Sequence, residues 1–289
     1  MTPMTPTTYQ KLLNKHVLII GGSSGLGAGV AEASLASGAY VTIASSSQVK
    51  IDATIARLRG LYPDLGPKIQ GVVVDLSFSS STTEAGINDP DRVLEEKLHH
   101  LFLVAPTLHS SPETTEQREI NHVILTAADA LSFHPLSSSS SLTPSTILAA
   151  SHFRLILPLI LAKVSAQHLP PSSTSSLTLT SGSLAEKPAP GCALTSYFAG
   201  GLVSLAKALA VEMKPVRVNV VRAGVVDTEL WSGSLGDNKR EEMMRGVRER
   251  SLTGREGKVE DVVEGYMWLM RDGNATGSVA GSDGGVLIV

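Results

Sequence analysis

The sequence is poor in the features that build disulfide frameworks, metal centres and membrane segments. Cys192 is the only cysteine in 289 residues, so an internal disulfide and a thiolate metal cluster are both excluded. The eight histidines are scattered, and the adjacent pair His99 and His100 has poor geometry for binding one ion, so we expect no metal site. The longest unbroken apolar run, residues 155–162, is too short to span a bilayer.

An excess of charge and a secretory signal are also missing. The net charge is −3, which favours neither nucleic acid nor an anionic membrane as a partner. The first nine residues are rich in threonine and proline and contain no basic, apolar signal segment, so we expect a cytoplasmic protein. Hydrophobic residues make up 42% and charged residues 18%, which is ordinary for a globular chain of this length.

Strand-like and helix-like runs alternate along the chain. Runs rich in β-branched residues predict strands at 17–21, 40–44, 69–75, 121–126, 177–180, 216–221 and 276–280. Apolar spacing predicts helices at 28–37, 50–61, around 93–102, and at 146–167, 195–214 and 259–271. Strict alternation predicts an α/β fold, a parallel sheet covered by helices on both faces, with ligands bound at the carboxyl ends of its strands. We expect a single domain over 15–289, a disordered extension over 1–14, and a polar surface insertion at about 106–119.

A glycine-rich turn is the most informative stretch of the sequence. Gly21 to Gly27 follows an apolar strand and opens a helix. Glycines allow a tight turn and a close approach of the backbone to a ligand, while the free amides at a helix N-terminus favour phosphate. The turn therefore predicts a pyrophosphate cradle, whose residues are Gly21, Ser23, Ser24, Gly25, Leu26 and Gly27. The simpler alternative is a turn that only ends a strand.

Further motifs follow this turn in a characteristic order. They are Asp75, Ala127-Ala128, Ser181-Gly182-Ser183, Tyr197, the run 218–224, Thr228, Gly254-Arg255 and the closing stretch 276–285. Together they resemble the short-chain dehydrogenase/reductase superfamily from about Lys15 to the C-terminus. The resemblance implies a Rossmann-type, doubly wound sheet and hydride exchange between a nicotinamide and a carbonyl carbon.

The resemblance implies a catalytic tyrosine, a serine that polarises the substrate oxygen, and a lysine four residues after the tyrosine. On it, Tyr197 would donate the proton and Ser183 would polarise the oxygen, with Ser181 as a nearby competitor. Gly201 occupies the lysine position, so the catalytic set is degenerate. Without the cation Tyr197 would be a weak base, which favours reduction. Tyr197 packing into the core, and Ser183 serving only the turn, remain the alternatives.

The stretch after the second strand bears on the choice of cofactor. An acidic residue there would favour NAD by accepting a hydrogen bond from the ribose, but the chain has Ser45, Ser46 and Lys50. We therefore expect NADP(H), with the alternative that these serines only cap a helix. The resemblance places Asp75 at the adenine edge, Ala127 and Ala128 along the cofactor, and Thr228 at the nicotinamide.

Within the superfamily, the chain is similar to an atypical fungal branch of secondary metabolism that includes bifunctional reductase/Diels–Alderases of indole alkaloid pathways. Arg154 matches the branch's active-site arginine and would clamp the substrate, or else be a surface arginine at a helix edge. Ala189 stands where the branch has an aspartate. We expect an NADPH-dependent reductase of a C=O or C=N bond in a small hydrophobic substrate. The alternatives are a cyclase that uses the same pocket and a catalytically weak nucleotide-binding protein. The resemblance also implies a homodimer or homotetramer, because the apolar helices around 147–162 and 202–211 match the family's usual association surfaces.

Overall fold

A seven-stranded parallel sheet forms the centre of the computed structural model, which describes residues 8–77, 90–110, 117–131, 133–137, 142–232 and 237–289. The strand order is β3-β2-β1-β4-β5-β6-β7, and every neighbouring pair is parallel. The strands are β1 (His16–Ile20), β2 (Tyr40–Ser45), β3 (Ile69–Val73), β4 (His122–Leu125), β5 (Ser176–Gly182), β6 (Arg217–Ala223) and β7 (Val279–Ser282). The predicted Rossmann-type α/β fold is confirmed.

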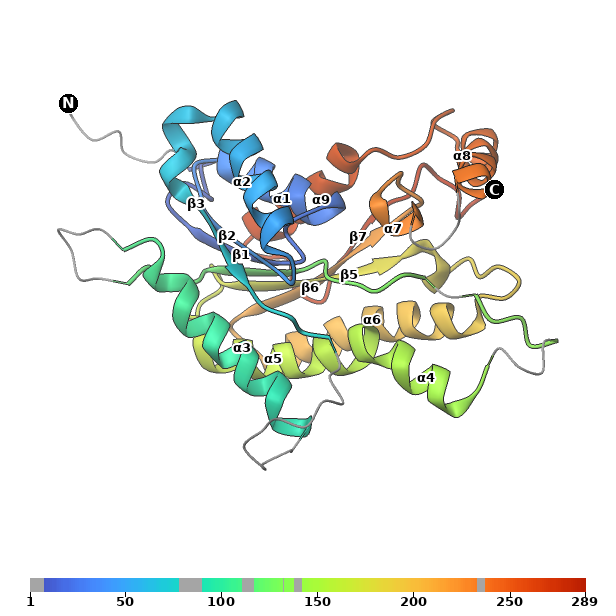
Figure 1. The fold of residues 1–289 in the computed structure, drawn as a ribbon, viewed down its shortest axis with the longest axis horizontal. Helices are drawn as coiled ribbons and strands as arrows, with labels where there is room; N and C mark the ends of the chain where they lie inside the picture. Colours follow the sequence, from blue (N-terminus) through green and yellow to red (C-terminus); the bar gives the residue numbers. More distant parts are fainter. Residues whose placement is uncertain (1–7, 78–89, 111–116, 132, 138–141, 233–236) are drawn as a thin grey trace.

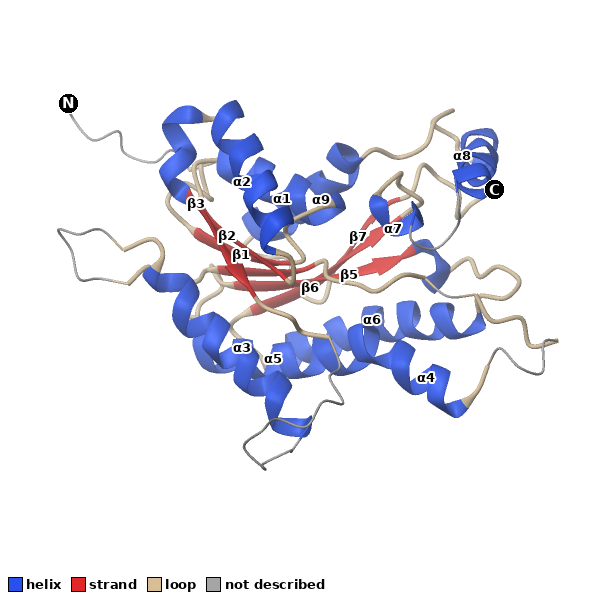
Figure 2. Ribbon diagram, in the orientation of Figure 1, coloured by secondary structure: helices blue, strands red, loops and turns tan. Residues whose placement is uncertain are grey.

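Helices cover both faces of this sheet, as Figures 1 and 2 show. One face carries α1 (Gly25–Ala36), α2 (Gln48–Leu61) and α9 (Val259–Arg271). The other carries α3 (Pro90–Thr107), α4 (Pro144–Ser151), α5 (Leu157–His168) and α6 (Ala193–Glu212). Between α4 and α5 the helix widens into a π-helical turn, His152–Ile156. Two further helices, α7 (Glu229–Ser232) and α8 (Asp237–Arg250), lie beyond the carboxyl ends of β5 and β6.

The apolar core lies on both sides of the sheet because successive strand residues point to opposite faces. All five residues of β1 are buried. Leu18 and Ile20 belong to the cluster under α3, α5 and α6, whereas Val17 and Ile19 belong to the cluster under α1 and α9. A continuous apolar run such as β1 is therefore what a strand buried on both faces requires.

Two helical stretches, residues 144–168 and 193–212, are long and apolar enough to cross a membrane by length and composition. Each of them has a face in the core beneath the sheet. Leu157 and Leu161 of α5 and Leu202 and Ala206 of α6 are buried there. Their apolar character therefore has an explanation within the fold.

The structure moves two predicted boundaries. Leu12 is buried and Asn14 N donates to Gly38 O at 3.0 Å, so residues 12–14 pack on the domain and the expected disorder does not apply to them. Residues 1–7 of the predicted extension lie outside the described residues. The predicted insertion at 106–119 begins inside α3, and its residues 111–116 lie outside the described part of the chain. Its far end is anchored, because the Arg118 guanidinium stacks on the Tyr40 ring at 3.7 Å.

Three histidines are buried at the amino-terminal edge of the sheet. His16 and His109 both hydrogen-bond Thr42 Oγ1, at 2.9 and 3.0 Å, and His122 Nδ1 lies 2.8 Å from Ser176 Oγ. Desolvation is the main cause that lowers the pKa of His16 to about 4 and those of His109 and His122 to about 3. The three rings are therefore neutral in the folded protein at pH 7.

These histidines predict a loss of stability in mild acid. The unfolded chain takes up protons below about pH 6.5, whereas the folded chain does not until pH 4 or 3. We expect the free energy of unfolding to fall between pH 7 and pH 5 by about 2 kcal/mol for each of the three histidines. Urea unfolding followed by circular dichroism would measure it. His122→Asn should reduce the slope and His100→Gln, at an exposed position of α3, should not; equal stability at pH 7 and pH 5 would refute the assignment.

Candidate cofactor and substrate site

The turn after β1 is packed so closely that two of its glycines cannot be replaced. Gly21 has φ +92°, and a Cβ there would lie 2.7 Å from the Ala127 Cα. A Cβ on Gly27 would lie 2.5 Å from the Thr126 Oγ1. The predicted cradle residues thus meet Ala127, and through it Ala128, at the carboxyl end of β4. This contact places the start of α1 at the edge of the sheet.

The N-terminus of α1 is open toward the site. Ser24 is its N-cap residue, but the Ser24 side chain makes no capping hydrogen bond. The first amides of the helix are therefore left for another acceptor, which favours an anion such as a phosphate. Gly25 has φ +49°, and a Cβ there would meet only the Thr228 side chain, at 3.5 Å. The structure thus brings two of the predicted cofactor-binding residues, Gly25 and Thr228, together across the cradle.

The predicted adenosine-side residues adjoin the cradle through β2. Ser23 Oγ donates to Ser45 Oγ at 2.7 Å, which ties the glycine turn to the end of that strand. Ser46 is exposed, whereas Ser47 caps α2 by accepting from Lys50 N at 3.4 Å. Lys50 Nζ forms an ion pair with Glu229 Oε2 at 2.8 Å, so this lysine reaches from α2 to α7 over the cradle.

Asp75 follows β3 on the same edge of the sheet. Its Oδ1 accepts from Ser77 N at 2.9 Å, and hydrogen bonds from Ser77, the largest cause, lower the pKa of the Asp75 carboxyl. The side chain is exposed and charged, at the end of the row formed by the ends of β1, β2 and β3. Its place is compatible with the adenine edge that the resemblance implies.

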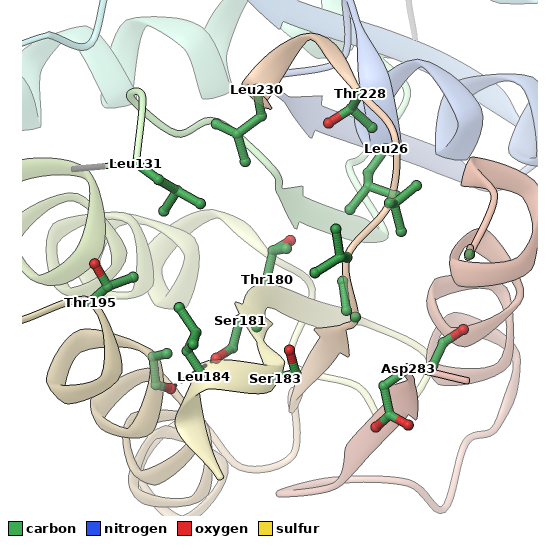
Figure 3. Close-up of a pocket in the computed structure, with 18 of the residues that line it drawn as sticks. Leu26, Leu131, Thr180, Ser181, Ser183, Leu184, Thr195, Thr228, Leu230 and Asp283 are labelled. Carbon is green, nitrogen blue, oxygen red and sulfur yellow. Dashed lines mark hydrogen bonds between the residues drawn. The ribbon is translucent and has the colours of Figure 1, made fainter. Parts of the chain in front are cut away.

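A cavity of about 800 Å³ continues from the cradle along the carboxyl ends of β4, β5, β6 and β7. Its walls are mostly apolar. Figure 3 shows Thr195 and Asp283 on opposite sides, with Ser181, Ser183 and Leu184 between them and Thr228 and Leu230 on a further side. Apolar side chains on its walls include Leu26, Leu131, Phe133, Phe153, Leu184, Leu230, Trp231 and Val286. A small hydrophobic molecule would fit beside the nucleotide cradle.

Ser181 and Ser183, at the end of β5, differ in how their hydroxyls are hydrogen-bonded. Ser181 Oγ donates to Ala199 O at 2.8 Å and so ties β5 to α6. Ser183 begins the turn after the strand and lines the cavity, and its hydroxyl has no hydrogen-bond partner among the described residues. Of the two, Ser183 is the one whose hydroxyl is available to a ligand, and its predicted role in polarising a substrate stays a prediction.

Tyr197 does not reach the cavity, which corrects its predicted place in the site. Its side chain is 72% exposed, and it is absent from the described cavity walls. Thr195, Ala199 and Leu202 form the cavity-facing stripe of α6, and a residue two positions from Thr195 lies on the opposite side of the helix. The cavity-facing pair with the family's spacing of four is therefore Thr195 and Ala199. Tyr197 and Gly201 lie on the outer side.

Arg154 lines the cavity, but its guanidinium is already paired with a carboxylate of the protein. It lies in the π-helical turn, and its guanidinium forms an ion pair with the Asp129 carboxylate and donates to Asp129 O at 2.9 Å. The Arg154 side chain is only 12% exposed, so the alternative of a surface arginine does not hold. The expected clamp on a substrate would compete with Asp129.

The described cavity walls carry few groups that could exchange a proton near pH 7. They contain no tyrosine and no histidine, and burial raises the pKa of the Cys192 thiol, which keeps it protonated. The described residues also contain no group of three or more His, Cys, Asp or Glu side chains that could hold a metal ion. The described walls therefore offer hydroxyl groups for hydrogen bonding and few groups for proton transfer.

The different hydrogen bonding of Ser181 and Ser183 predicts that their alanine variants differ in stability. Ser181→Ala removes a buried hydrogen bond between β5 and α6 and should lower the free energy of unfolding by about 1 kcal/mol. Ser183→Ala removes a hydroxyl without a partner among the described residues and should leave it unchanged. Chemical denaturation of both variants beside the parent measures this, and equal destabilisation by the two would contradict the assignment.

Comparison with known proteins agrees with the fold and the order of motifs. A family model for the SDR-like Rossmann domain matches residues 8–289. The short-chain dehydrogenase/reductase fsr5 of Gibberella fujikuroi is 34% identical over 279 residues, which cover 96% of this chain and 96% of that protein.

Solved structures extend the comparison. MalC Reductase/Diels-Alderase from Malbranchea aurantiaca is 33% identical with a TM-score of 0.82, over 98% of this chain and 100% of that one. A small-chain dehydrogenase solved in complex with NADPH has a TM-score of 0.67 at 20% identity, over 96% of this chain and 100% of that one, which shows a shared fold. The resemblance to a fungal branch that includes reductase/Diels–Alderases is thereby confirmed.

Proposed function

The chain belongs to the short-chain dehydrogenase/reductase family, and we propose that it is an NADPH-dependent reductase of a C=O or C=N bond in a small hydrophobic molecule of secondary metabolism. Proteins with this Rossmann domain are oxidoreductases that bind a nicotinamide cofactor. The observation that carries the proposal is the continuity of the glycine cradle with a mostly apolar cavity. A dinucleotide in the cradle would point its reactive end toward a substrate in the cavity.

The residues present fit such a cofactor. The cradle from Gly21 to Gly27 offers uncapped helix amides to a pyrophosphate, and Thr228, Ala127 and Ala128 lie where the cavity meets it. When bound, the nicotinamide supplies a hydride, which is chemistry that protein side chains cannot provide. Hydroxyls of Ser45 and Ser46 and the charge of Lys50, with no acidic side chain among 44–51, favour the 2′-phosphate of NADPH over the free ribose of NADH. To bind that phosphate, Lys50 would exchange its exposed partner Glu229, at little energetic cost.

The composition of the cavity favours a C=N bond within this substrate class. Reduction of a carbonyl leaves an alkoxide that needs a proton, whereas reduction of an iminium ion gives a neutral amine directly. Thr195 and Ala199 are the cavity-facing residues separated by four positions, which is the separation of the family's catalytic tyrosine and lysine. Ser183 would then orient the substrate by hydrogen bonding, without having to deliver a proton.

Gly25 provides a test of cofactor binding with a matched control. Gly25→Asp would place a carboxylate against the pyrophosphate, whereas Gly25→Asn adds nearly the same volume without charge, and both residues tolerate a positive φ. We expect the parent to bind NADPH more tightly than NADH in a fluorescence titration. The aspartate variant should bind NADPH at least about tenfold more weakly than the asparagine variant. Equal affinities of the two variants would place the phosphates elsewhere.

The roles of Ser183 and Tyr197 can be separated by activity. With a panel of cyclic imines and ketones, Ser183→Ala should slow NADPH oxidation about 10²-fold, because it removes the hydroxyl that orients the substrate. Tyr197→Phe should stay within about twofold of the parent because the side chain lies outside the cavity. A large loss in Tyr197→Phe with no loss in Ser183→Ala would reverse this assignment.

A second candidate function is cyclisation of a biosynthetic intermediate in the same cavity. The similarity to MalC, over nearly the full length of both chains, favours it, because that protein is a reductase and a Diels–Alderase. Ala189 lines the cavity where the resembling branch has an aspartate, so this chain would not use that carboxylate. Cyclised product formed without NADPH oxidation would support this function, and strictly coupled oxidation would support reduction alone.

We further propose that the protein is a cytoplasmic homodimer or homotetramer. Leu148, Leu155, Leu159 and Val211 are large apolar side chains that stand exposed on the helical stretches 144–168 and 193–212. A second copy of the chain would cover them, which favours association. Sedimentation of the purified protein would measure its mass in solution.

A further inference from the structure

Some of the charged side chains that line the apolar cavity form ion pairs or hydrogen bonds within the protein, and others do not. Among the described residues four cations and two carboxylates line it, namely Arg154, Lys187, Arg250, Arg255, Asp261 and Asp283. A charge beside an apolar cavity interacts more strongly than one in open water, because the low-dielectric wall screens it less. The partners of these six groups therefore decide which charge the cavity offers to a ligand.

Both carboxylates are neutralised by arginines. Asp261 accepts from Arg255 through two hydrogen bonds, at 2.5 and 3.0 Å, and Arg255 is the main cause that lowers the pKa of Asp261 to about 2. Asp283 accepts from Arg222 at 3.1 Å. Neither carboxylate is therefore an open site for a cation, and neither would strongly repel an anion.

Two of the other cations, Arg154 and Lys187, also bind groups of the protein. Arg154 forms its ion pair with Asp129. Lys187 Nζ donates to Val286 O at 2.7 Å and to Val289 O, so it holds the C-terminal segment against the loop that follows Ser183. Either side chain would have to break protein contacts before it could bind a ligand.

Arg250 is different. It is the last residue of α8, it is exposed where it lines the cavity, and it has no hydrogen bond or ion pair among the residues that the structure describes. Its guanidinium lies back over Gly246, one helical turn earlier, where Nη2 is 3.6 Å from the position that a Cβ would occupy. An available guanidinium thus stands at the solvent-facing rim of the cavity.

We propose that Arg250 is a substrate-binding residue, and that the substrate carries an anionic oxygen group, such as a carboxylate, on an apolar body. The apolar body would fill the cavity while the anionic group stays at the rim, where an arginine fork matches carboxylate geometry. This assignment rests on the proposed function, because it names the substrate class of the same cavity.

A structural role for Arg250 makes a different prediction. A cation in the last turn of a helix interacts favourably with the helix dipole, as Arg248 does in the same turn. That interaction affects the stability of α8 and not the charge preference of the cavity. Ligand affinity, compared between a charged and a neutral ligand of the same shape, therefore separates the two roles.

Two fluorescent probes provide this comparison. The first, 8-anilinonaphthalene-1-sulfonate, carries an anionic group, and the second, N-phenyl-1-naphthylamine, is the same aromatic body without it. Both would be titrated without cofactor into the parent, Arg250→Gln, and Arg245→Gln, which changes an exposed arginine of α8 that does not line the cavity. Leu184→Trp, which reduces the cavity, shows whether the probes bind there, and circular dichroism confirms that each variant is folded.

We expect Arg250→Gln to weaken binding of the sulfonate about fivefold and to leave the neutral probe unchanged. Arg245→Gln should change neither, Leu184→Trp should weaken both, and 0.5 M salt should reduce the effect of Arg250. Equal affinity of the sulfonate for parent and Arg250→Gln, equal weakening of both probes by Arg250→Gln, or no binding of either probe in the cavity would each overturn the proposal. Because no cofactor is present, a failure of NADPH binding in the Gly25 titrations would be a separate result.

Discussion

The close packing of the first β–α turn against the end of β4 is the constraint on which the rest of the site depends. Neither Gly21 nor Gly27 has room for a side chain, because Ala127 and Thr126 occupy that space. This approach aligns β1 with β4 and brings the uncapped start of α1 to the sheet edge. The cavity then follows from the sheet itself, because β4, β5, β6 and β7 end side by side next to that helix start.

The fold was predictable because its signals are local. Buried parallel strands appear as apolar runs, so the sequence predicts a strand at 17–21, where β1 lies at 16–20, and a helix at 259–271, which are the observed bounds of α9. The glycine turn was also predictable, since its backbone demands belong to one short segment. The packing of residues 12–14 could not be predicted locally, because the burial of Leu12 depends on distant residues of the core.

The side chains that α6 contributes to the cavity were harder to predict, because they depend on which face of the helix points inward. Tyr197 matches a residue type, but the inner face of α6 is defined by Ala199, Leu202, Ala206 and Leu209. Thr195 is in phase with these residues and Tyr197 is not, so apolar periodicity could have placed Thr195 on the wall. The ion pair of Arg154 with Asp129 could not be read from the sequence in the same way, because it joins a helix to a loop 25 residues away.

The π-helical turn at residues 152–156 is a place where a change in chain length could alter the shape of the cavity in related proteins. A π-helical turn absorbs one additional residue inside an α-helix, whereas the same insertion in a regular helix would rotate all that follows by about 100°. Here the turn carries Arg154, while α5 keeps Leu157 and Leu161 on the sheet. Deletion of one residue from this turn would restore regular α-helical geometry and rotate α4 relative to α5, which would change the position of Arg154 relative to one of these helices. The shape of this wall is thus open to evolution through small changes in chain length as well as through side-chain replacement.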